Sequence, residues 1–120
     1  MAIVILPAYQ PDETLVGIVN RLWETGSRNI VVDDGSGAEY RHIFDSIGDI
    51  CTVLRHPENK GKGAAIKTAL AYIKKEIGGR EAVGVMDADG QHLTEDMWRF
   101  LDAAVSHKNT LVLGVRREGV

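Results

Sequence analysis

The stretch "AIVILPAYQP" (residues 2–11) indicates the fold class of the chain. Its first five residues are all apolar, which is typical of a strand covered on both faces of a sheet. Prolines and polar residues follow at once, so the strand is expected to end soon after position 6. A strand that is buried on both sides needs other elements above and below it, and the rest of the chain is expected to supply helices there.

The remaining sequence alternates similar apolar runs with helical patterns. Apolar residues spaced three and four positions apart predict helices with inner faces at 15–22, 40–47, 66–77 and 97–105. The third of these is marked by Ile66, Ala69, Leu70, Ile73 and Ile77. Further strands are expected at 29–34, 50–56, 82–86 and 110–115. Gly26 should end the first helix, and Gly78 with Gly79 the third. This order predicts an α/β fold with a mainly parallel sheet and helices on both faces.

Composition narrows the class of protein. The chain has 120 residues, which favours one domain with one core, and its net charge of −3 gives no support for nucleic acid as a partner. Cys51 is the single cysteine, so no internal disulfide can form; it and the two tryptophans, Trp23 and Trp98, are expected to pack against the core. No basic leader precedes the first strand and no apolar run reaches the roughly 18 residues of a membrane helix, so a cytoplasmic location is expected.

Polar residues and glycines gather at the expected carboxyl ends of the strands. These ends read "PAYQP" (7–11), "DDGSG" (33–37), "RHPENKGKG" (55–63), "DADGQH" (87–92) and "VRREG" (115–119). Sheets of this type bind ligands at the carboxyl ends of their strands, because the connecting loops meet there. This edge of the sheet is therefore expected to be the functional site.

Asp87 and Asp89 follow the fourth strand with one residue between them. In extended chain their carboxylates point the same way, and such oxygen ligands suit Mg²⁺ or Mn²⁺. Gln91 and His92 follow closely and can complete the shell. The same residues also fit an arrangement without any ligand, in which an Asp-Gly turn follows the strand and Thr94 caps a helix.

Asp33 and Asp34 form a second acidic pair at the end of a strand, in "VVDDGSG" (31–37). Carboxylates there can accept hydrogen bonds from a nucleobase or ribose, while Gly35 and Gly37 let the chain turn and approach closely. An Asp-Gly turn with a helix cap fits these residues as well.

The segment "NKGKGAAI" (59–66) resembles a phosphate loop but lacks the required spacing. No Ser or Thr follows Lys62, and Ile66 stands where a dinucleotide motif has its third small residue. Lys60 or Lys62 beside a helix start can still contact a nucleotide, and the alternative is that both are solvated. Tyr9 can stack on a base or cover the core.

Four motifs together carry a family resemblance. "ILPAYQ" (5–10), "VVDDGS" (31–36), "NKGKGAA" (59–65) and "MDADGQH" (86–92), in this order at strand ends, resemble family 2 glycosyltransferases of the GT-A fold. The similarity is greatest to the dolichol-phosphate mannosyltransferase and polyprenyl-phosphate glycosyltransferase branch, and it covers the whole chain. It implies inverting transfer of a sugar from a UDP- or GDP-sugar to an acceptor, such as a polyprenyl phosphate, with Mg²⁺ or Mn²⁺.

The resemblance also implies residue roles. It assigns nucleotide-sugar binding to Pro7, Ala8, Tyr9, Val32, Asp34, Lys62, Asp87, Ala88, Asp89 and Arg116, and metal binding to Asp87, Asp89 and Gln91. Within this set, Pro7 and Tyr9 frame the nucleobase. Asp34 holds the base or ribose, with the backbone of Val32. Arg116 reaches the donor phosphates.

Differences from the family pattern limit which residue roles can be transferred from the family to this chain. Members often have Asn and Glu where this chain has Gln10 and Pro11. Family catalytic domains are also longer, so residues 1–120 are expected to be the donor-binding half, without the catalytic base, inactive alone and prone to self-association. The full-length protein would then work at the cytoplasmic face of a membrane.

Two other functions remain open from the sequence. A sugar-nucleotide nucleotidyltransferase also uses an α/β sheet and metal-binding acids, but it carries a glycine-rich loop where this chain has "PAYQPDE" (7–13). A nucleotide-binding module without catalysis is the third interpretation.

Overall fold

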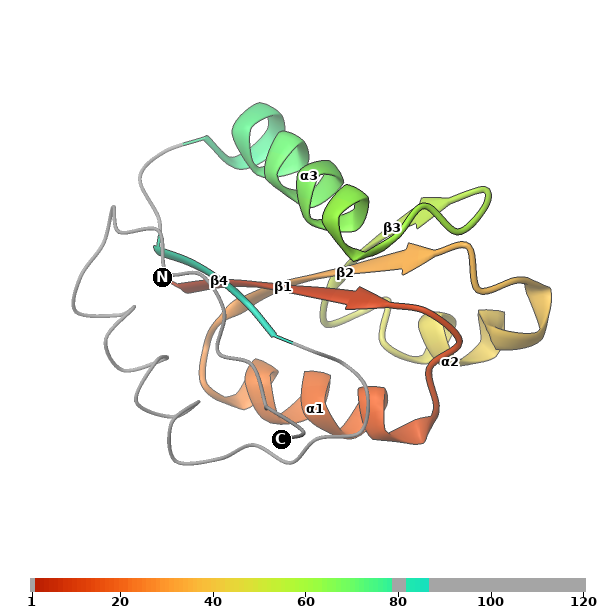
Figure 1. Cartoon of the computed structure of the whole chain (residues 1–120). Coiled ribbons are helices and arrows are strands. Elements are labelled where there is room, and N and C mark those ends of the chain that lie inside the picture. The colour runs from red at the N-terminus through yellow and green to blue at the C-terminus, as the bar shows by residue number, and fades with distance from the viewer. Residues whose placement is uncertain (1, 79–81, 87–120) are drawn as a thin grey trace, which may run out of the picture.

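The computed structural model of the chain describes residues 2–78 and 82–86, in which strands and helices alternate (Figure 1). The strands are β1 (Ala2–Ala8), β2 (Arg28–Asp34), β3 (Thr52–His56) and β4 (Ala82–Val85). The helices are α1 (Glu13–Glu24), α2 (Arg41–Ser46) and α3 (Lys62–Tyr72), with a 3₁₀ turn, η1 (Ala38–Tyr40), before α2 and a π-helical turn, η2 (Ile73–Ile77), after α3. These elements confirm the predicted order; the expected helix at 97–105 and strand at 110–115 lie outside the described residues.

The four described strands form one parallel sheet in the order β3-β2-β1-β4. Ile5 of β1 pairs with Ile30 of β2 on one side and with Val85 of β4 on the other. Beyond β2, Ile30 pairs with Thr52 of β3. Because the strands are parallel, their carboxyl ends share one edge, at the right of Figure 1, where the chain leaves β1, β2 and β3 in loops. The prediction of a mainly parallel α/β sheet is confirmed for this part of the chain.

Apolar side chains fill the space on both faces of the sheet. Val4 and Leu6 of β1 belong to the cluster beneath α1 and α2, whereas Ile3 and Ile5 belong to the cluster beneath α3 (Figure 1). All four are at most 1% exposed, and burial of each such side chain contributes about 2 kcal/mol. The first strand is therefore covered on both faces, as its unbroken apolar run predicts.

Helix α1 follows its sequence signals closely. The Asp12 side chain accepts a hydrogen bond from the N–H of Thr14 over 2.9 Å, and this bond holds the pKa of Asp12 below its usual value. The predicted inner face is buried: Leu15, Ile18, Val19 and Leu22. The helix ends at Glu24, and Gly26 stops it there: this glycine has a φ of +83° and donates its N–H to the carbonyl of Trp23. Trp23 itself is 53% exposed, so the expectation that it packs against the core is wrong.

Helix α3 packs on the opposite face through small residues. Ala65, Ala69 and Ile73, spaced four apart, are buried against the sheet. Leu70 is 36% exposed, so its predicted place on the inner face is wrong, because the alanine stripe and not the leucine faces the strands. The π-helical turn closes at Gly78, which has a φ of +63° and donates its N–H to the carbonyl of Ile73 over 2.7 Å. No helix within residues 2–78 and 82–86 has both the length and the apolar composition that crossing a membrane requires.

Candidate functional site

The loops after β1 and β2 are joined at the carboxyl edge of the sheet. The N–H of Gln10, after β1, donates to Ser36 Oγ, after β2, over 2.8 Å. The N–H of Ser36 in turn donates to Asp33 Oδ1 over 2.9 Å. Gln10 has a φ of +50°, a left-handed conformation that residues other than glycine adopt infrequently. The bond to Ser36 therefore helps to hold a bend in the first loop that the backbone does not favour by itself.

Asp34, the last residue of β2, joins the loop after β3 to the same edge. Its Oδ1 accepts from the N–H of Lys60 over 2.9 Å and lies 2.8 Å from Nδ1 of His56. Its Oδ2 accepts from Nδ2 of Asn59 over 3.0 Å and from the N–H of Gly61 over 2.8 Å. The segment between β3 and α3 is thus folded around one carboxylate, with two hydrogen bonds at each oxygen.

These contacts decide the charge of Asp34. The residue is 4% exposed, and burial alone would raise the pKa of its carboxyl because burial penalises the charged form. Hydrogen bonds from His56 and from the N–H groups of Lys60 and Gly61 outweigh burial and hold the pKa of Asp34 below its usual value. A carboxylate has about four lone-pair sites, and protein donors occupy this number at Asp34. A direct bond from Asp34 to a base or ribose would have to replace one of them.

His56, the last residue of β3, connects this carboxylate to α3. Its ring is 8% exposed and lies between two oxygens, with Nδ1 2.8 Å from Asp34 Oδ1 and Nε2 2.8 Å from Thr68 Oγ1. A neutral imidazole with its proton on Nδ1 fits both contacts, since it donates to the carboxylate and accepts from the threonine hydroxyl. The edge of the sheet, the loop after β3 and helix α3 therefore form one hydrogen-bonded unit.

Gly35 lets the loop after β2 lie against the loop after β3. Its φ is +73°, and an added Cβ would lie 2.8 Å from Glu58 Cα and closer still to the Glu58 carbonyl carbon and the Asn59 nitrogen. Side chains do not approach backbone so closely, so glycine alone fits this position. The predicted turn is confirmed here, and the close approach is to the loop after β3; an approach to a ligand stays a prediction. At Gly37, with a φ of +99° and no neighbour within 4 Å, only the turn is needed.

Asp33 is engaged in a different way from its neighbour. It is 3% exposed, and its Oδ2 accepts a hydrogen bond from Arg55 Nε over 3.2 Å. The Arg55 side chain is 43% exposed, so this ion pair is partly screened by water. Both carboxylates of the second acidic pair thus hold protein groups in place.

The predicted donor-binding residues of the described chain lie along this edge or next to it. Pro7 is half-buried and Ala8 is buried at the end of β1, and Tyr9, the next residue, is 52% exposed. Val32 pairs with Pro7 across the sheet, and its side chain is fully buried, so that side chain does not reach the surface. Lys62 is exposed as the first residue of α3. Tyr9 and Lys62 are therefore the exposed members of this group.

The remaining predicted site residues lie outside the described residues: Asp87, Ala88, Asp89, Gln91 and Arg116. Strand β4 runs parallel to β1, and the N–H of Met86, which directly precedes Asp87 in the sequence, donates to the carbonyl of Ile5 over 2.9 Å. Within residues 2–78 and 82–86, no group of three or more His, Cys, Asp or Glu side chains could hold a metal ion. The assignment of the metal ligands stays a prediction.

The motifs at this edge match an established family over nearly the whole chain. The sequence model described as "Glycosyl transferase family 2" matches residues 3–119. The chain belongs to glycosyl transferase family 2. This confirms the family that the four motifs resemble, and the four-stranded parallel sheet flanked by helices is consistent with the GT-A fold of its members.

Curated relatives of this family 2 chain are similar over most of its length. The UDP-N-acetylglucosamine--dolichyl-phosphate N-acetylglucosaminyltransferase of Methanococcus voltae is 30% identical over 130 residues, which cover 93% of the chain and 50% of the relative. The polyprenol monophosphomannose synthase of Mycolicibacterium smegmatis is 32% identical over 107 residues, or 84% of the chain and 40% of the relative. An uncharacterised protein of Methanocaldococcus jannaschii is 33% identical over 118 residues, or 94% and 45%. The chain spans about half the length of the curated relatives it matches. No solved structure matches it significantly.

Two residues that shape the site of this family 2 chain were not expected from its sequence. His56 and Asn59 both contact the Asp34 carboxylate, although they lie 22 and 25 positions away from it. The one local signal is their place in "RHPENKG" (55–61), where an apolar strand ends in polar residues just before a glycine. That signal indicates a loop, but it does not indicate which residue the loop contacts.

Proposed function

We propose that residues 1–120 form the nucleotide-sugar-binding half of a glycosyltransferase catalytic domain. The protein would transfer a sugar, with inversion, from a nucleotide diphosphate sugar to a polyprenyl phosphate. Family membership supports the reaction class, and the names of two relatives, which refer to a dolichyl phosphate and a polyprenol, support the acceptor class. The observation that carries donor binding is the carboxyl edge of the sheet, where Asp34 and Ser36 tie three loops together next to the exposed Tyr9.

The exposed side chains at this edge are suited to a nucleotide. The ring of Tyr9 offers an apolar face on which a base can stack, with Pro7 and Ala8 beside it in β1. Lys62 adds a positive charge at the start of α3, where the helix dipole also favours negatively charged groups. Asp34 acts on the donor chiefly by holding the loop after β3 in position.

A divalent ion is the cofactor that the predicted ligand set fits. Asp87, Asp89 and Gln91 would supply two carboxylates and an amide oxygen, which are the hard ligands that Mg²⁺ and Mn²⁺ prefer. When bound, such an ion neutralises charge that develops on a leaving nucleoside diphosphate. Arg116 would add charge-assisted hydrogen bonds to the same phosphates.

A phosphate acceptor simplifies the chemistry that the protein must supply. A polyprenyl phosphate is already an anion at neutral pH, so it can attack the sugar carbon without a general base, which a hydroxyl acceptor would need. A lipid acceptor would place the reaction at a membrane surface, and we propose the cytoplasmic face. The expectations that residues 1–120 alone transfer no sugar and that they self-associate stay predictions.

The proposal is tested with the complete gene product and a short polyprenyl phosphate. UDP-N-acetylglucosamine or GDP-mannose with Mn²⁺ should give a polyprenyl-phosphate sugar, detected by mass spectrometry, with inverted configuration in the NMR spectrum. Formation of a nucleotide sugar from a nucleoside triphosphate and a sugar phosphate would instead establish the nucleotidyltransferase alternative. Tight nucleotide binding without turnover of any donor would establish the binding module.

Asp89→Asn gives a sharper test of the metal ligands. It removes one charged ligand, so metal-dependent binding of UDP or GDP should weaken about tenfold or more in calorimetry. The matched control is Asp45→Asn, at an exposed position on α2, which should leave nucleotide binding unchanged. Equal affinity of wild type and Asp89→Asn, with and without Mn²⁺, would show that Asp89 is not a metal ligand.

A further inference from the structure

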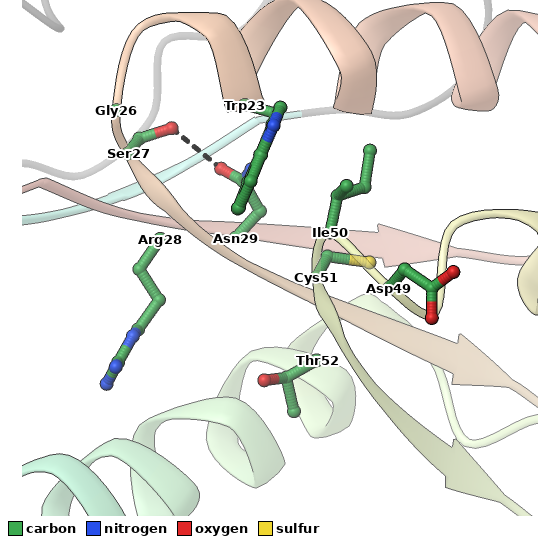
Figure 2. Close-up of a pocket in the computed structure, with 9 residues that line it drawn as sticks. All are labelled: Trp23, Gly26, Ser27, Arg28, Asn29, Asp49, Ile50, Cys51 and Thr52. Atoms are coloured by element: carbon green, nitrogen blue, oxygen red, sulfur yellow. Dashed lines mark hydrogen bonds between the residues drawn. The ribbon is translucent and has the colours of Figure 1, made fainter.

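A pocket of about 630 Å³ lies at the amino edge of the sheet, opposite the proposed donor site. It is formed by the end of α1, the start of β2 and the segment that leads into β3 (Figure 2). Asn29 in its lining and Asp34 at the other edge are five positions apart in β2, which corresponds to roughly 16 Å along a parallel strand. The volume is within the range of about 300–1,000 Å³ that is usual for small-molecule sites.

The amide of Asn29 is incompletely satisfied. The residue is 1% exposed, and its Oδ1 lies 2.8 Å from Ser27 Oγ, whose single hydrogen can go either to this oxygen or to the carbonyl of Leu22, 3.0 Å away. Its Nδ2 is buried and makes no hydrogen bond within the part of the chain that the structure describes. Rotating the amide by 180° would let Nδ2 donate to Ser27 and leave Oδ1 unpartnered instead. Because buried polar groups are almost always paired, either arrangement leaves a buried group that a ligand can satisfy once a neighbouring side chain uncovers it.

The surroundings of this amide are mainly apolar. Trp23 is 53% exposed and extends from the end of α1 toward the strands, and Ile50 stands on the segment before β3 (Figure 2). Cys51 is half-buried; burial raises the pKa of its thiol to about 12, so the thiol is neutral, and it donates to the carbonyl of Ile47. An exposed indole ring next to these groups favours a ligand with a flat apolar face.

The charged residues of the lining do not select a charged ligand. Arg28 and Asp49 are both exposed. In Figure 2 both side chains point away from Trp23, and that of Arg28 leaves toward α3. The lining therefore carries one cation and one anion at its exposed rim, with no net charge, and otherwise offers an amide, the hydroxyls of Ser27 and Thr52 and apolar surface.

We propose that this pocket binds a neutral, hydroxyl-rich ring, the chemical class to which monosaccharides belong. A hydroxyl group both donates and accepts, so it satisfies Asn29 in either rotation of the amide. The C–H face of such a ring packs on the indole of Trp23, and the remaining hydroxyls stay in water. The site goes beyond the proposed transfer reaction and does not depend on it, because it lies at the other end of β2.

NMR spectroscopy of the ¹⁵N-labelled protein tests the proposal. Titration with methyl glucoside and with N-acetylglucosamine should shift the side-chain amide of Asn29 and the indole N–H of Trp23 together, and saturably. Cyclohexanol, a ring of similar size with one hydroxyl group, should bind more weakly. Trp23→Ala and Asn29→Ala should each weaken sugar binding by about tenfold, as expected for one ring contact or one buried hydrogen bond.

Two matched variants control for effects of removing a ring or an amide elsewhere in the protein. Tyr9→Ala removes an aromatic ring of nearly equal exposure, 52%, at the opposite edge of the sheet, and Asn20→Ala removes an exposed amide of α1. Neither should change sugar binding. Trp23 is exposed, so its variant keeps the test valid even where Asn29→Ala unfolds the protein.

Three results would overturn the proposal. The first is the absence of any shift at Asn29 or Trp23 at the highest soluble sugar concentration. The second is binding of cyclohexanol as tight as that of the sugars, and the third is a loss of sugar binding in Tyr9→Ala, which would place the sugar in the donor site. These three measurements of sugar and cyclohexanol binding do not depend on the transferase proposal, because none of them involves nucleotide, metal or turnover.

Discussion

Replacing Asp34 by Asn should destabilise the protein much more than the same replacement at Asp33. The two residues are adjacent and equally buried, at 4% and 3% exposure, so they form a matched pair. They differ in what they hold. Asp34 accepts from four protein donors, one at the end of β3 and three in the loop that follows, whereas Asp33 accepts from one backbone N–H and from a half-exposed arginine.

The expected loss of stability follows from the number of hydrogen-bond donors that each carboxylate binds. In Asp34→Asn, the amide nitrogen must replace one oxygen and will face two donors. At the Oδ1 position it faces His56, whose ring can change tautomer and accept, and the N–H of Lys60, which cannot. One charge-assisted bond, worth about 1.5–3 kcal/mol, is lost, and the other three lose their ionic character, so a cost of about 3 kcal/mol is expected. In Asp33→Asn the amide can turn its nitrogen toward Arg55 and keep Ser36, at a cost of about 1 kcal/mol or less.

Urea unfolding followed by circular dichroism measures both variants, provided that the slope of the free energy with urea is unchanged. The pH dependence gives a second readout. The pKa of Asp34 is lower in the folded state, so its ionised form contributes stability that is complete above the ordinary value of 3.8 and is lost as the pH falls through the folded pKa. The difference in the free energy of unfolding between wild type and Asp34→Asn should therefore become smaller below about pH 4. Equal stabilities of the two variants at neutral pH, within about half a kcal/mol, would refute the view that Asp34 organises the loop.

Three further predictions rest on single residues. In urea unfolding, Gly35→Ala should cost at least about 1 kcal/mol more stability than Gly37→Ala, because both glycines have positive φ but only Gly35 touches the next loop. Equal losses of stability would contradict the close approach. Tyr9→Ala should lower nucleotide affinity by about tenfold in calorimetry and leave stability within about 0.5 kcal/mol, and unchanged affinity would exclude stacking on Tyr9. Cys51, with a pKa of about 12, should react slowly with iodoacetamide at pH 8 when folded and quickly in urea, and a fast reaction of the folded protein would show an accessible thiolate.

The fold was predictable where the signal is local. The unbroken apolar run of β1, the four-residue spacing in α1 and the glycine at its end each depend on neighbouring residues, and the structure confirms them. The errors concern which side of a helix faces the sheet. Leu70 and Trp23 are apolar and lie near the expected stripes, but the small residues Ala65 and Ala69 face the strands from α3, and Trp23 is exposed at the end of α1. Periodicity identifies an apolar stripe without fixing the rotation of the helix about its axis.

The position of the candidate site was predictable from the sequence, but the hydrogen bonds within it were not. Polar residues at the ends of parallel strands locate the edge, and Asp33 and Asp34 were found in this way. Their partners were not, because the contact of Asp34 with Asn59 joins residues 25 positions apart and depends on how the loop after β3 folds. The same limit applies to Asn29, an ordinary polar residue in the sequence. That its Nδ2 has no partner among the described residues is visible only once its neighbours are placed.

The two edges of the sheet differ in how their buried polar groups are used. At the carboxyl edge, Asp33, Asp34 and His56 each have protein partners, so these groups stabilise the loops and have little capacity left for a ligand. Ligand affinity there should come from exposed side chains such as Tyr9, together with the residues that follow β4, and it should be separable from stability by mutation. At the amino edge the relation is reversed, because Nδ2 of the buried Asn29 side chain lacks a partner among the residues that the structure describes, and a ligand that supplies one would stabilise the fold as it binds. A rise in unfolding temperature with monosaccharide that is absent in Trp23→Ala would therefore distinguish a ligand held by this edge from one held at the donor site.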